Sequence, residues 1–411
     1  MRLFLVQQVE GRKGKTMHIF YAANNTPNSN FTINSNVWRD NLYLTLRDLG
    51  HDVTEFDYDL KETFRKCDKS RDRNFISRNR PRVTRELLRQ IKKAHAERPI
   101  DLFFSYFSDA CVLPEGISAI GDMGVKTMNW YCNGSYQFHL VEEISPYYDW
   151  CLVPERFRLK DYVSIGANPI YCQEAANPNV YRPYDLPVEF DVTFIGQAYG
   201  ERPQYVSHLL EQGIDIRVWG YGWDKLSQNC FSPATNPVRR LSRAVKEFLA
   251  GADWQDTFRR LLNMELFRSA QRMVADASVL TFPGEVVGGV LSDSEMVKMY
   301  SRSKINLGFS SCDNLVESEE RIVQIRLRDF EVPMSGGFYM VEYMEELEEF
   351  FKIGEEIVCY RGQEDLTDKV RYFLKNDSSR ERIREAGYRR CLRDHTWHER
   401  FDRVFQETGL V

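Results

Sequence analysis

Two arginines and a glutamate stand close together at Arg326, Arg328 and Glu331, in a stretch whose pattern predicts one helix. Arg328 and Glu331 are three residues apart, so their side chains share a helix face. One interpretation is a solvent-exposed ion pair, which stabilises a helix little. The other is a nucleotide site, in which arginine holds phosphate and the carboxylate accepts both hydroxyls of a ribose. Gly336 and Gly337 end the helix and let the next strand pass close to a ligand.

A second candidate site for phosphate is the turn that begins at Gly196 and Gln197, directly after an apolar run. Gly200 gives the turn a second flexible position, and Arg202 begins the helix expected at 202–212. The first N–H groups of that helix, and the positive end of its dipole, point at the turn. A diphosphate would fit there, although any tight turn between a strand and a helix also favours glycine.

Two residues are candidates for proton transfer, and both follow apolar runs of the first half of the chain. His139 could face a ligand and accept a proton, or it could be an ordinary surface histidine. Asp109 is the second candidate base. Neither residue belongs to a motif that identifies a catalytic group, so both stay open.

We predict that the protein needs neither a metal ion nor a cofactor. Asp57 and Asp59 form an Asp-x-Asp pair, which in other proteins holds a divalent ion on a diphosphate. Here the pair follows a predicted strand, where acids commonly begin a loop. The nine cysteines include no Cys-x-x-Cys pair and no cluster with histidine at metal spacing. We therefore expect reduced thiols.

The segment 65–98 is strongly basic, with thirteen Lys or Arg residues against four acids in a chain whose net charge is −5. Exposed helices usually mix both signs. The excess therefore predicts an anionic partner, such as a nucleic acid, a phospholipid surface or a charged glycan. An exposed arm or an oligomer contact is the alternative. The predicted patch consists of Arg78, Arg80, Arg82, Arg85 and Arg89.

Short apolar runs alternate with helical patterns through both halves of the chain, which is typical of parallel α/β sheets. A chain of 411 residues also exceeds what one hydrophobic core usually organises. The strands of the first series are expected at 17–23, 53–56, 101–106, 126–131, 150–153 and 163–165. Those of the second are expected at 190–196, 214–219, 304–309, 338–343 and 357–360. Helices are expected at 38–49, 202–212, 366–374, 379–392 and 399–408.

These series predict two Rossmann-like domains joined by a turn-rich hinge. The expected parts are a leader at 1–16, a first domain at 17–171 that contains the basic segment, a hinge at 172–189, a second domain at 190–395 with a helical insertion at 224–275, and a final helix at 396–411. The composition, 43% hydrophobic and 28% charged, includes no long uncharged apolar run and no signal-peptide pattern. We therefore expect a cytoplasmic protein without a transmembrane segment.

Several motifs together resemble the spore-maturation CgeB-like branch of the group 1 glycosyltransferases. In the second half they are the stretches 191–197 with Arg202, 220–223, 291–309, 328–331 with 335–338, and 394–400. The resemblance is looser in the first half, through 36–42, 50–51 and 124–131. It covers most of 190–405 apart from the insertion.

The resemblance implies the GT-B fold, with a nucleotide-sugar donor, UDP-sugar favoured, held by the second domain and an acceptor held by the first. Glu331 falls where such enzymes bind the nucleotide ribose, and Arg328 and Arg202 fall near the diphosphate. It also favours retention at the anomeric carbon. Two positions depart from the pattern. Val323 replaces a second glutamate common in relatives, and Cys132-Asn133 stands where relatives often carry an acid.

The sequence thus predicts a metal-independent glycosyltransferase whose acceptor is anionic, with a hydroxylated base in DNA as one candidate. A nucleotide-sugar epimerase would use a similar fold without an acceptor. A module that binds a nucleotide sugar or a nucleic acid without catalysis is the other alternative. The donor sugar, the acceptor and the oligomeric state stay open.

Overall fold

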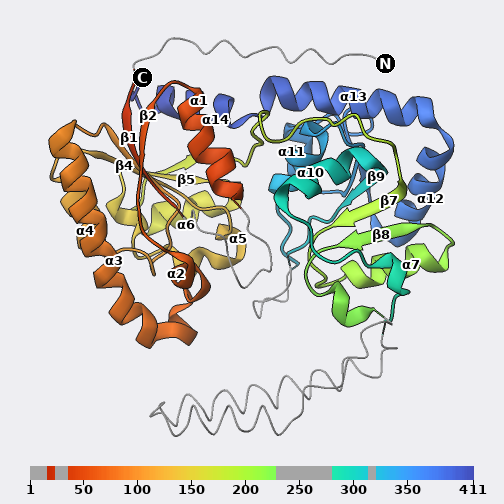
Figure 1. Cartoon of the computed structure of the whole chain (residues 1–411), viewed down its shortest axis with the longest axis horizontal. Helices are drawn as coiled ribbons and strands as arrows, with labels where there is room; N and C mark the ends of the chain where they lie inside the picture. The colour runs from red at the N-terminus through yellow and green to blue at the C-terminus, as the bar shows by residue number, and fades with distance from the viewer. Residues whose placement is uncertain (1–15, 24–35, 228–279, 313–320) are drawn as a thin grey trace, which may run out of the picture. The chain divides into compact units, whose positions relative to one another are not determined.

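The computed structural model describes residues 16–23, 36–227, 280–312 and 321–411 (Figure 1). The chain divides into two compact units, of which unit 1 consists of Met1–Ile195 and Val290–Val411 and unit 2 of Gly196–Gly289. The expected leader up to residue 15, and the expected insertion from residue 228 onward, lie outside the described residues. The domain boundaries drawn from the sequence stay a prediction.

The first sheet of unit 1 has six strands in the order β2-β1-β3-β4-β5-β6, and every pairing is parallel. The residues of β1, β3 and most of β4 and β5 are buried, as expected for a parallel sheet covered on both faces. The strands are β1 (His18–Ala22), β2 (Asp52–Glu55), β3 (Leu102–Ser105), β4 (Lys126–Trp130), β5 (Trp150–Val153) and β6 (Pro169–Tyr171).

Five of these six strands lie where the apolar runs predict them, whereas the strand expected at 163–165 is wrong. That stretch falls in α6 and its C-terminal cap, where Tyr162 is buried and Val163 is 61% exposed. A run of three apolar residues is too short to separate a strand from a helix by period. The sixth strand is β6, which begins at Pro169.

The connections of the first sheet are mostly helical. A π-helical turn, η1, and α1 together fill the helix expected at 38–49, and Gly50 ends it with a φ of 87°. The helices are η1 (Arg39–Tyr43), α1 (Leu44–Asp48), α2 (Lys61–Arg65), α3 (Lys69–Glu97), α4 (Pro114–Gly121), α5 (Gly134–Gln137), η2 (Phe138–Leu140), η3 (Ser145–Tyr147), η4 (Arg156–Arg158) and α6 (Leu159–Ser164).

The basic segment contains the whole of the long helix α3. Asp68 caps its start by accepting the Ser70 N–H at 2.9 Å. One face of the helix is buried, with members three or four residues apart, as an amphipathic helix requires. This face consists of Ile76, Asn79, Arg80, Val83, Thr84, Leu87 and Ile91.

The second sheet has five strands in the order β11-β10-β9-β7-β8, of which the first four belong to unit 1 and pair in parallel. Each lies within a residue or two of a predicted apolar run. The four strands are β7 (Phe190–Ile195), β9 (Ser303–Gly308), β10 (Tyr339–Glu342) and β11 (Val358–Tyr360). The helices that follow in this part of unit 1 are α10 (Asp293–Arg302), α11 (Leu327–Met334), η7 (Glu345–Glu349), α12 (Gly362–Lys375), α13 (Asp377–Asp394) and α14 (Trp397–Glu407).

The last helix, α14, returns to the first sheet, where Figure 1 shows it near α1. Trp397 meets Trp130 of β4 edge-on, with ring centroids 5.0 Å apart, and Phe401 meets Phe104 of β3 at 5.5 Å. The entry to α14 also binds the segment after β6, because Ala176 accepts the Trp397 N–H at 3.4 Å. These contacts place α14 in the core of the first sheet.

Unit 2 contains α7 (Arg202–Glu211), β8 (Ile216–Trp219), η5 (Trp223–Leu226) and η6 (Gly284–Val286). Its backbone packs closely around Gly220, where a side-chain Cβ would lie 2.3 Å from the Gly196 carbonyl oxygen. The indole of Trp223 donates to that same oxygen at 2.7 Å. Glycine is therefore required at position 220 by the packing of this turn.

Candidate functional site

Helix α11 carries three of the residues that the sequence singles out, and its own ends explain why it forms. The Asp329 carboxylate accepts the Arg326 N–H at 2.8 Å, which caps the first turn. Phe330 is fully buried among Phe350, Phe351 and His395. The helix therefore begins, buries its apolar face and stops as the sequence predicts.

Glu331 is buried, with only 3% of its surface exposed, so the interpretation as a solvent-exposed ion pair is wrong. The Tyr300 hydroxyl donates to Glu331 Oε2 at 3.3 Å, and the Tyr181 hydroxyl also bonds the carboxyl. Arg328 Nε donates to Tyr300 Oη at 3.3 Å, so the tyrosine links the two charged groups. Burial raises the pKa of Glu331, and the nearby Arg328 opposes that rise.

Arg326 and the two glycines serve the packing around α11. The Arg326 guanidinium donates to the carbonyl oxygens of Phe309 at 3.1 Å and Ser311 at 2.8 Å, which ties the end of β9 to the start of the helix. Gly336 has a φ of 70°, and a Cβ on Gly337 would lie 2.8 Å from the Val332 side chain. Both glycines are thus required by the turn from α11 into β10.

The candidate phosphate turn lies in unit 2. The Arg202 guanidinium donates to the Gln197 carbonyl at 3.0 Å and to the Tyr199 hydroxyl at 2.6 Å, and it stacks over the Tyr199 ring. Arg202 is 6% exposed. The arginine therefore braces the turn that begins at Gly196, and the role of Gly196, Gln197 and Arg202 in binding phosphate stays a prediction.

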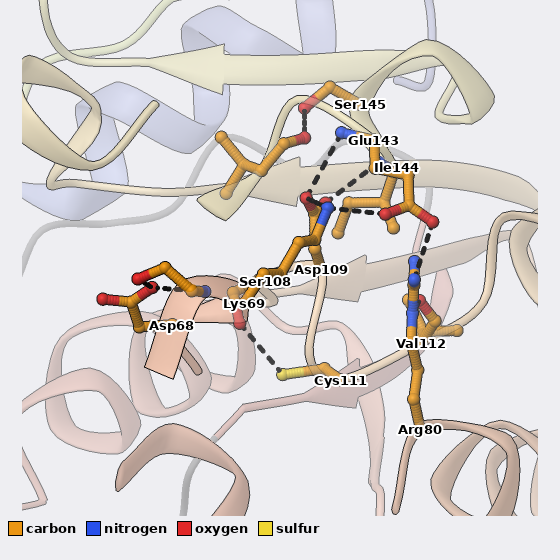
Figure 2. Close-up of polar contacts among 12 residues, drawn as sticks. Asp68, Lys69, Arg80, Ser108, Asp109, Cys111, Val112, Glu143, Ile144 and Ser145 are labelled. Carbon is orange, nitrogen blue, oxygen red and sulfur yellow. Dashed lines mark hydrogen bonds and ion pairs between the residues drawn. The ribbon is translucent and has the colours of Figure 1, made fainter. Parts of the chain in front are cut away.

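Asp109 is fully buried and held from several sides (Figure 2). Lys69 Nζ lies 2.6 Å from Asp109 Oδ2, and the Ile144 N–H donates to Oδ1 at 3.1 Å. Burial raises the pKa of Asp109, while Lys69 opposes that rise. Lys69 also pairs with Glu143, so the carboxylate belongs to an ion-pair cluster between α3 and the loop after η2. This geometry gives Asp109 a structural role and offers no support for its assignment as a base.

His139 is exposed and lies in the short helix η2, after the carboxyl end of β4. The structure therefore places it at the surface, as the alternative interpretation expects. Whether it contacts a substrate stays a prediction.

The predicted basic patch separates into two kinds of arginine. Arg80 is 7% exposed, its Nε donates to the Val112 carbonyl at 2.6 Å, and it pairs with Glu143 at 2.6 Å (Figure 2). Arg80 is therefore not part of an exposed patch, contrary to the prediction. The side chains of Arg78, Arg82, Arg85 and Arg89 are exposed on α3, and of these Arg89 pairs with Glu86.

Two buried glutamates were missed by the sequence analysis. Glu155 follows the carboxyl end of β5 and is 4% exposed, and Glu174 follows β6 and is 5% exposed. Burial raises the pKa of Glu155 to about 8 and raises that of Glu174 well above its usual range. The sixth strand was expected at 163–165, whereas it ends at Tyr171. Glu174 was therefore not recognised as a residue that follows the end of a strand. Glu155 could have been found from the sequence, since it comes two residues after a correctly predicted strand.

Within the described ranges, no three His, Cys, Asp or Glu side chains come together in a way that could hold a metal ion. Asp57 and Asp59 are exposed in the loop between β2 and α2, where Asp59 accepts the Lys61 N–H at 2.9 Å. The described cysteines are free thiols. Among the helices that the structure describes, none combines the length and the apolar character that crossing a bilayer demands.

The sequence matches a known family over its second half. Residues 202–406 fit the model of the family described as glycosyl transferase-like. The matched segment includes α7 in unit 2 and α11 with Arg328 and Glu331 in unit 1. Among the curated proteins, none matches the sequence.

Solved structures with a similar fold cover nearly the whole chain. Sucrose-phosphate synthase from Thermosynechococcus elongatus is 11% identical, with 96% of this chain and 99% of that chain covered and a TM-score of 0.54. A glycosyltransferase from Rickettsia africae is 11% identical, with 96% and 98% covered and a TM-score of 0.52. Anabaena HepE, solved in complex with UDP, is 6% identical, with 96% and 100% covered and a TM-score of 0.51. These likenesses confirm the predicted GT-B fold class, with two Rossmann-like parallel sheets.

Replacing Asp109 by Asn tests the structural role of its carboxylate. The amide keeps only one acceptor oxygen, so its NH2 group would face either the Ile144 N–H or the Lys69 ammonium, and the charge that Lys69 pairs with is lost. We therefore expect the free energy of unfolding to fall by about 1–3 kcal/mol. Urea unfolding measures the change. The control is Glu62→Gln, which removes the exposed ion pair with Lys66 and should leave stability nearly unchanged. Equal stability of Asp109→Asn and wild type would contradict this interpretation.

Proposed function

We propose that this chain is a glycosyltransferase that transfers a sugar from a nucleoside-diphosphate sugar to an acceptor hydroxyl without a metal ion. The fit of residues 202–406 to the glycosyl transferase-like family model and the GT-B fold support the proposal. The observation that carries the proposal is the buried group of Glu331, Tyr300 and Arg328 on and beside α11. A carboxylate linked through a tyrosine to an arginine offers adjacent groups for a ribose and a phosphate.

On the donor side, the Glu331 carboxylate accepts hydrogen bonds from the two hydroxyl groups of the nucleotide ribose. Its two tyrosine contacts do not exhaust the lone pairs of a carboxylate. Arg328 donates through Nε to Tyr300, and we assign its other N–H groups to phosphate, with Arg326 nearby at the start of the same helix. UDP is our choice of nucleotide, since HepE has been solved with UDP and shares this fold.

On the leaving-group side, cationic side chains take the place of a metal ion. As the bond between the sugar and the diphosphate breaks, negative charge grows on the phosphate oxygens, and guanidinium groups fixed beforehand stabilise that charge. Retention at the anomeric carbon is part of the proposal and is supported by the family resemblance alone. That Gly196, Gln197 and Arg202 bind the diphosphate, and that His139 accepts a proton, stay predictions.

On the acceptor side, the exposed arginines of α3 bind an anionic acceptor, and a DNA duplex is the acceptor we propose to test. Arg78, Arg82 and Arg85 are spaced by four and three residues, so they form one stripe along the helix. Arginine matches phosphate geometry well. Such a stripe without interleaved acids suits a polyanion.

Glu331→Gln tests the donor site. The substitution keeps the shape of the side chain but weakens charge-assisted hydrogen bonds, so we expect UDP affinity to fall roughly ten- to a hundredfold. Calorimetric titration of UDP into both proteins measures the change, with the melting temperature as a check on folding. Glu348→Gln, an exposed glutamate bonded to Tyr343, is the control and should bind UDP like wild type. If Glu331→Gln does so too, the donor site lies elsewhere.

Excess chelator should leave turnover unchanged, because arginines rather than a metal ion stabilise the leaving diphosphate. Slow hydrolysis of a UDP-sugar, followed as release of UDP, provides the readout without an identified acceptor. A protein that only binds nucleotide sugars would give no hydrolysis. Activity that disappears with chelator and returns with magnesium or manganese would rule out the metal-free mechanism and return attention to Asp57 and Asp59.

Reversing three exposed arginines, Arg78, Arg82 and Arg85, to Glu tests the acceptor surface. We expect the triple variant to lose most of its affinity for a short DNA duplex, and wild-type binding to weaken steeply with added salt. UDP affinity should not change. A matched control reverses three exposed cations elsewhere, Lys352, Lys375 and Arg382, with the same change in net charge. Equal loss in both variants would show that net charge alone matters, and absence of wild-type DNA binding would refute a DNA acceptor.

A further inference from the structure

Two carboxyl groups in the interior of unit 1 each have an oxygen that nothing in the described chain satisfies. Glu155 Oε2 and Glu174 Oε2 are sealed from solvent, and neither has a hydrogen-bond partner among the described residues. Both side chains are more than nine-tenths buried. Burying a polar atom without a partner costs free energy, so such an atom in a native fold calls for a ligand or another functional explanation.

The two groups come from neighbouring strands at the same edge of the sheet. β5 and β6 are parallel neighbours, and each glutamate follows the carboxyl end of its strand. That edge is where open α/β sheets bind their ligands. The Ser135 N–H, which follows the carboxyl end of β4, donates to Glu155 Oε1 at 3.1 Å. A Cβ on Gly134 would lie 3.0 Å from the unsatisfied Oε2, so a larger residue at this position would crowd the oxygen.

The same region reaches the proposed donor site on α11. After burial, the charges that most raise the pKa of Glu174 are those of Glu331 and Glu155, while Arg326 opposes them. The Ser135 hydroxyl also hydrogen-bonds Gln324, two residues before Arg326. A nucleotide sugar whose ribose lay at Glu331, and which extended toward Glu174 and Glu155, would therefore run from its ribose through its diphosphate to its sugar.

The chemistry of these groups fits a sugar hydroxyl better than another phosphate. Their raised pKa values favour the neutral carboxylic acid, which both donates and accepts a hydrogen bond, as a hydroxyl group does. A phosphate group would instead be repelled by any of these acids that ionised. Neutral acids carry no negative charge to offset the positive charges of Arg326 and Arg328, so those charges can act on the diphosphate.

We propose that Glu155 and Glu174 bind hydroxyl groups of the transferring sugar and so determine which sugar the enzyme accepts. This inference rests on the proposed function, because it requires a nucleotide-sugar donor at Glu331. Both residues are binding residues that touch the substrate, and no proton needs to leave or arrive for them to act.

The test compares UDP with UDP-sugars in Glu155→Leu and Glu174→Leu. We expect UDP affinity to stay within about twofold of wild type, while affinity for the preferred member of a panel of UDP-glucose, UDP-galactose and UDP-N-acetylglucosamine falls roughly tenfold or more. Glu349→Leu, an exposed position paired with Arg156, is the matched control and should change neither value. Equal losses for UDP and UDP-sugar, or no loss for either, would overturn the proposal.

The melting temperature provides a second readout, which a structural role would move the other way. Leucine removes the unsatisfied oxygen, so Glu174→Leu should melt at a higher temperature than wild type. Glu155→Leu also leaves the Ser135 N–H without its acceptor, so its gain should be smaller. If leucine prevents folding, Glu155→Asp and Glu174→Asp keep the chemistry and withdraw the carboxyl group by one methylene. They should then lose UDP-sugar affinity selectively, and unchanged affinity would overturn the proposal. Failure of wild type to bind UDP would instead refute the proposed function.

The gain from Glu155→Leu should depend on pH in a defined direction. The folded-state pKa of about 8 lies above the ordinary 4.5, so wild type loses stability as pH rises from about 4.5 to about 8 and no further above that. Burial is the largest cause of this raised pKa; Glu346 adds to it, and the Ser135 N–H and Arg158 oppose it. Glu155 in turn raises the pKa values of its neighbours Glu174, Cys132 and Tyr162. The difference in melting temperature between variant and wild type should therefore widen across this window. A constant difference would contradict the neutral acid on which the hydroxyl match depends.

Discussion

The insertion of α14 into the core of the first sheet is the interaction on which the rest of unit 1 depends. Trp397 and Phe401 pack on the aromatic side chains of β4 and β3, and they are almost completely buried. Aromatic side chains of this size dominate the energetics of a core. The first sheet is therefore completed by residues from the far end of the sequence.

That insertion also fixes the segment after β6, which carries groups of the candidate site. Arg400 Nε donates to the Gln173 carbonyl, next to Glu174, and the start of α14 pairs with Ala176. A few residues later, Tyr181 reaches both Asn41 and Glu331. The buried acids are thus held by backbone that cannot move away to relieve their desolvation. The same packing that stabilises the fold forces these carboxyl groups to stay without solvent.

Much of this architecture could be predicted from the sequence, because apolar runs bounded by turn residues are a strong signal for parallel strands. The helix at Glu331 was also predictable, since Phe330, Met334 and Gly336 mark its buried face and its end. The failures have physical reasons. The run at 163–165 was too short to show a period, and Val163 points to solvent.

The site was harder to predict than the fold. Arg80 was grouped with the exposed arginines by charge, although its spacing from Ile76 and Val83 puts it on the buried face of α3. The proximity of three buried acids, Glu155, Glu174 and Glu331, depends on which strands are neighbours in the sheet and on the path of the segment after β6. No local spacing encodes that arrangement. Burial, which gives these acids their unusual chemistry, is likewise a property of the folded chain.

The place of α14 has a consequence for the order in which the protein is made. Gln173 and Arg400 are 227 residues apart, yet they meet beside the first sheet. The ribosome synthesises the six strands of that sheet long before it reaches Trp397. During this part of translation the sheet therefore exposes the apolar surface that α14 later covers. Contacts between such distant residues form slowly, and nascent chains with exposed apolar surface are the ones that chaperones bind. The first half of the molecule is therefore completed only after the second sheet has been synthesised.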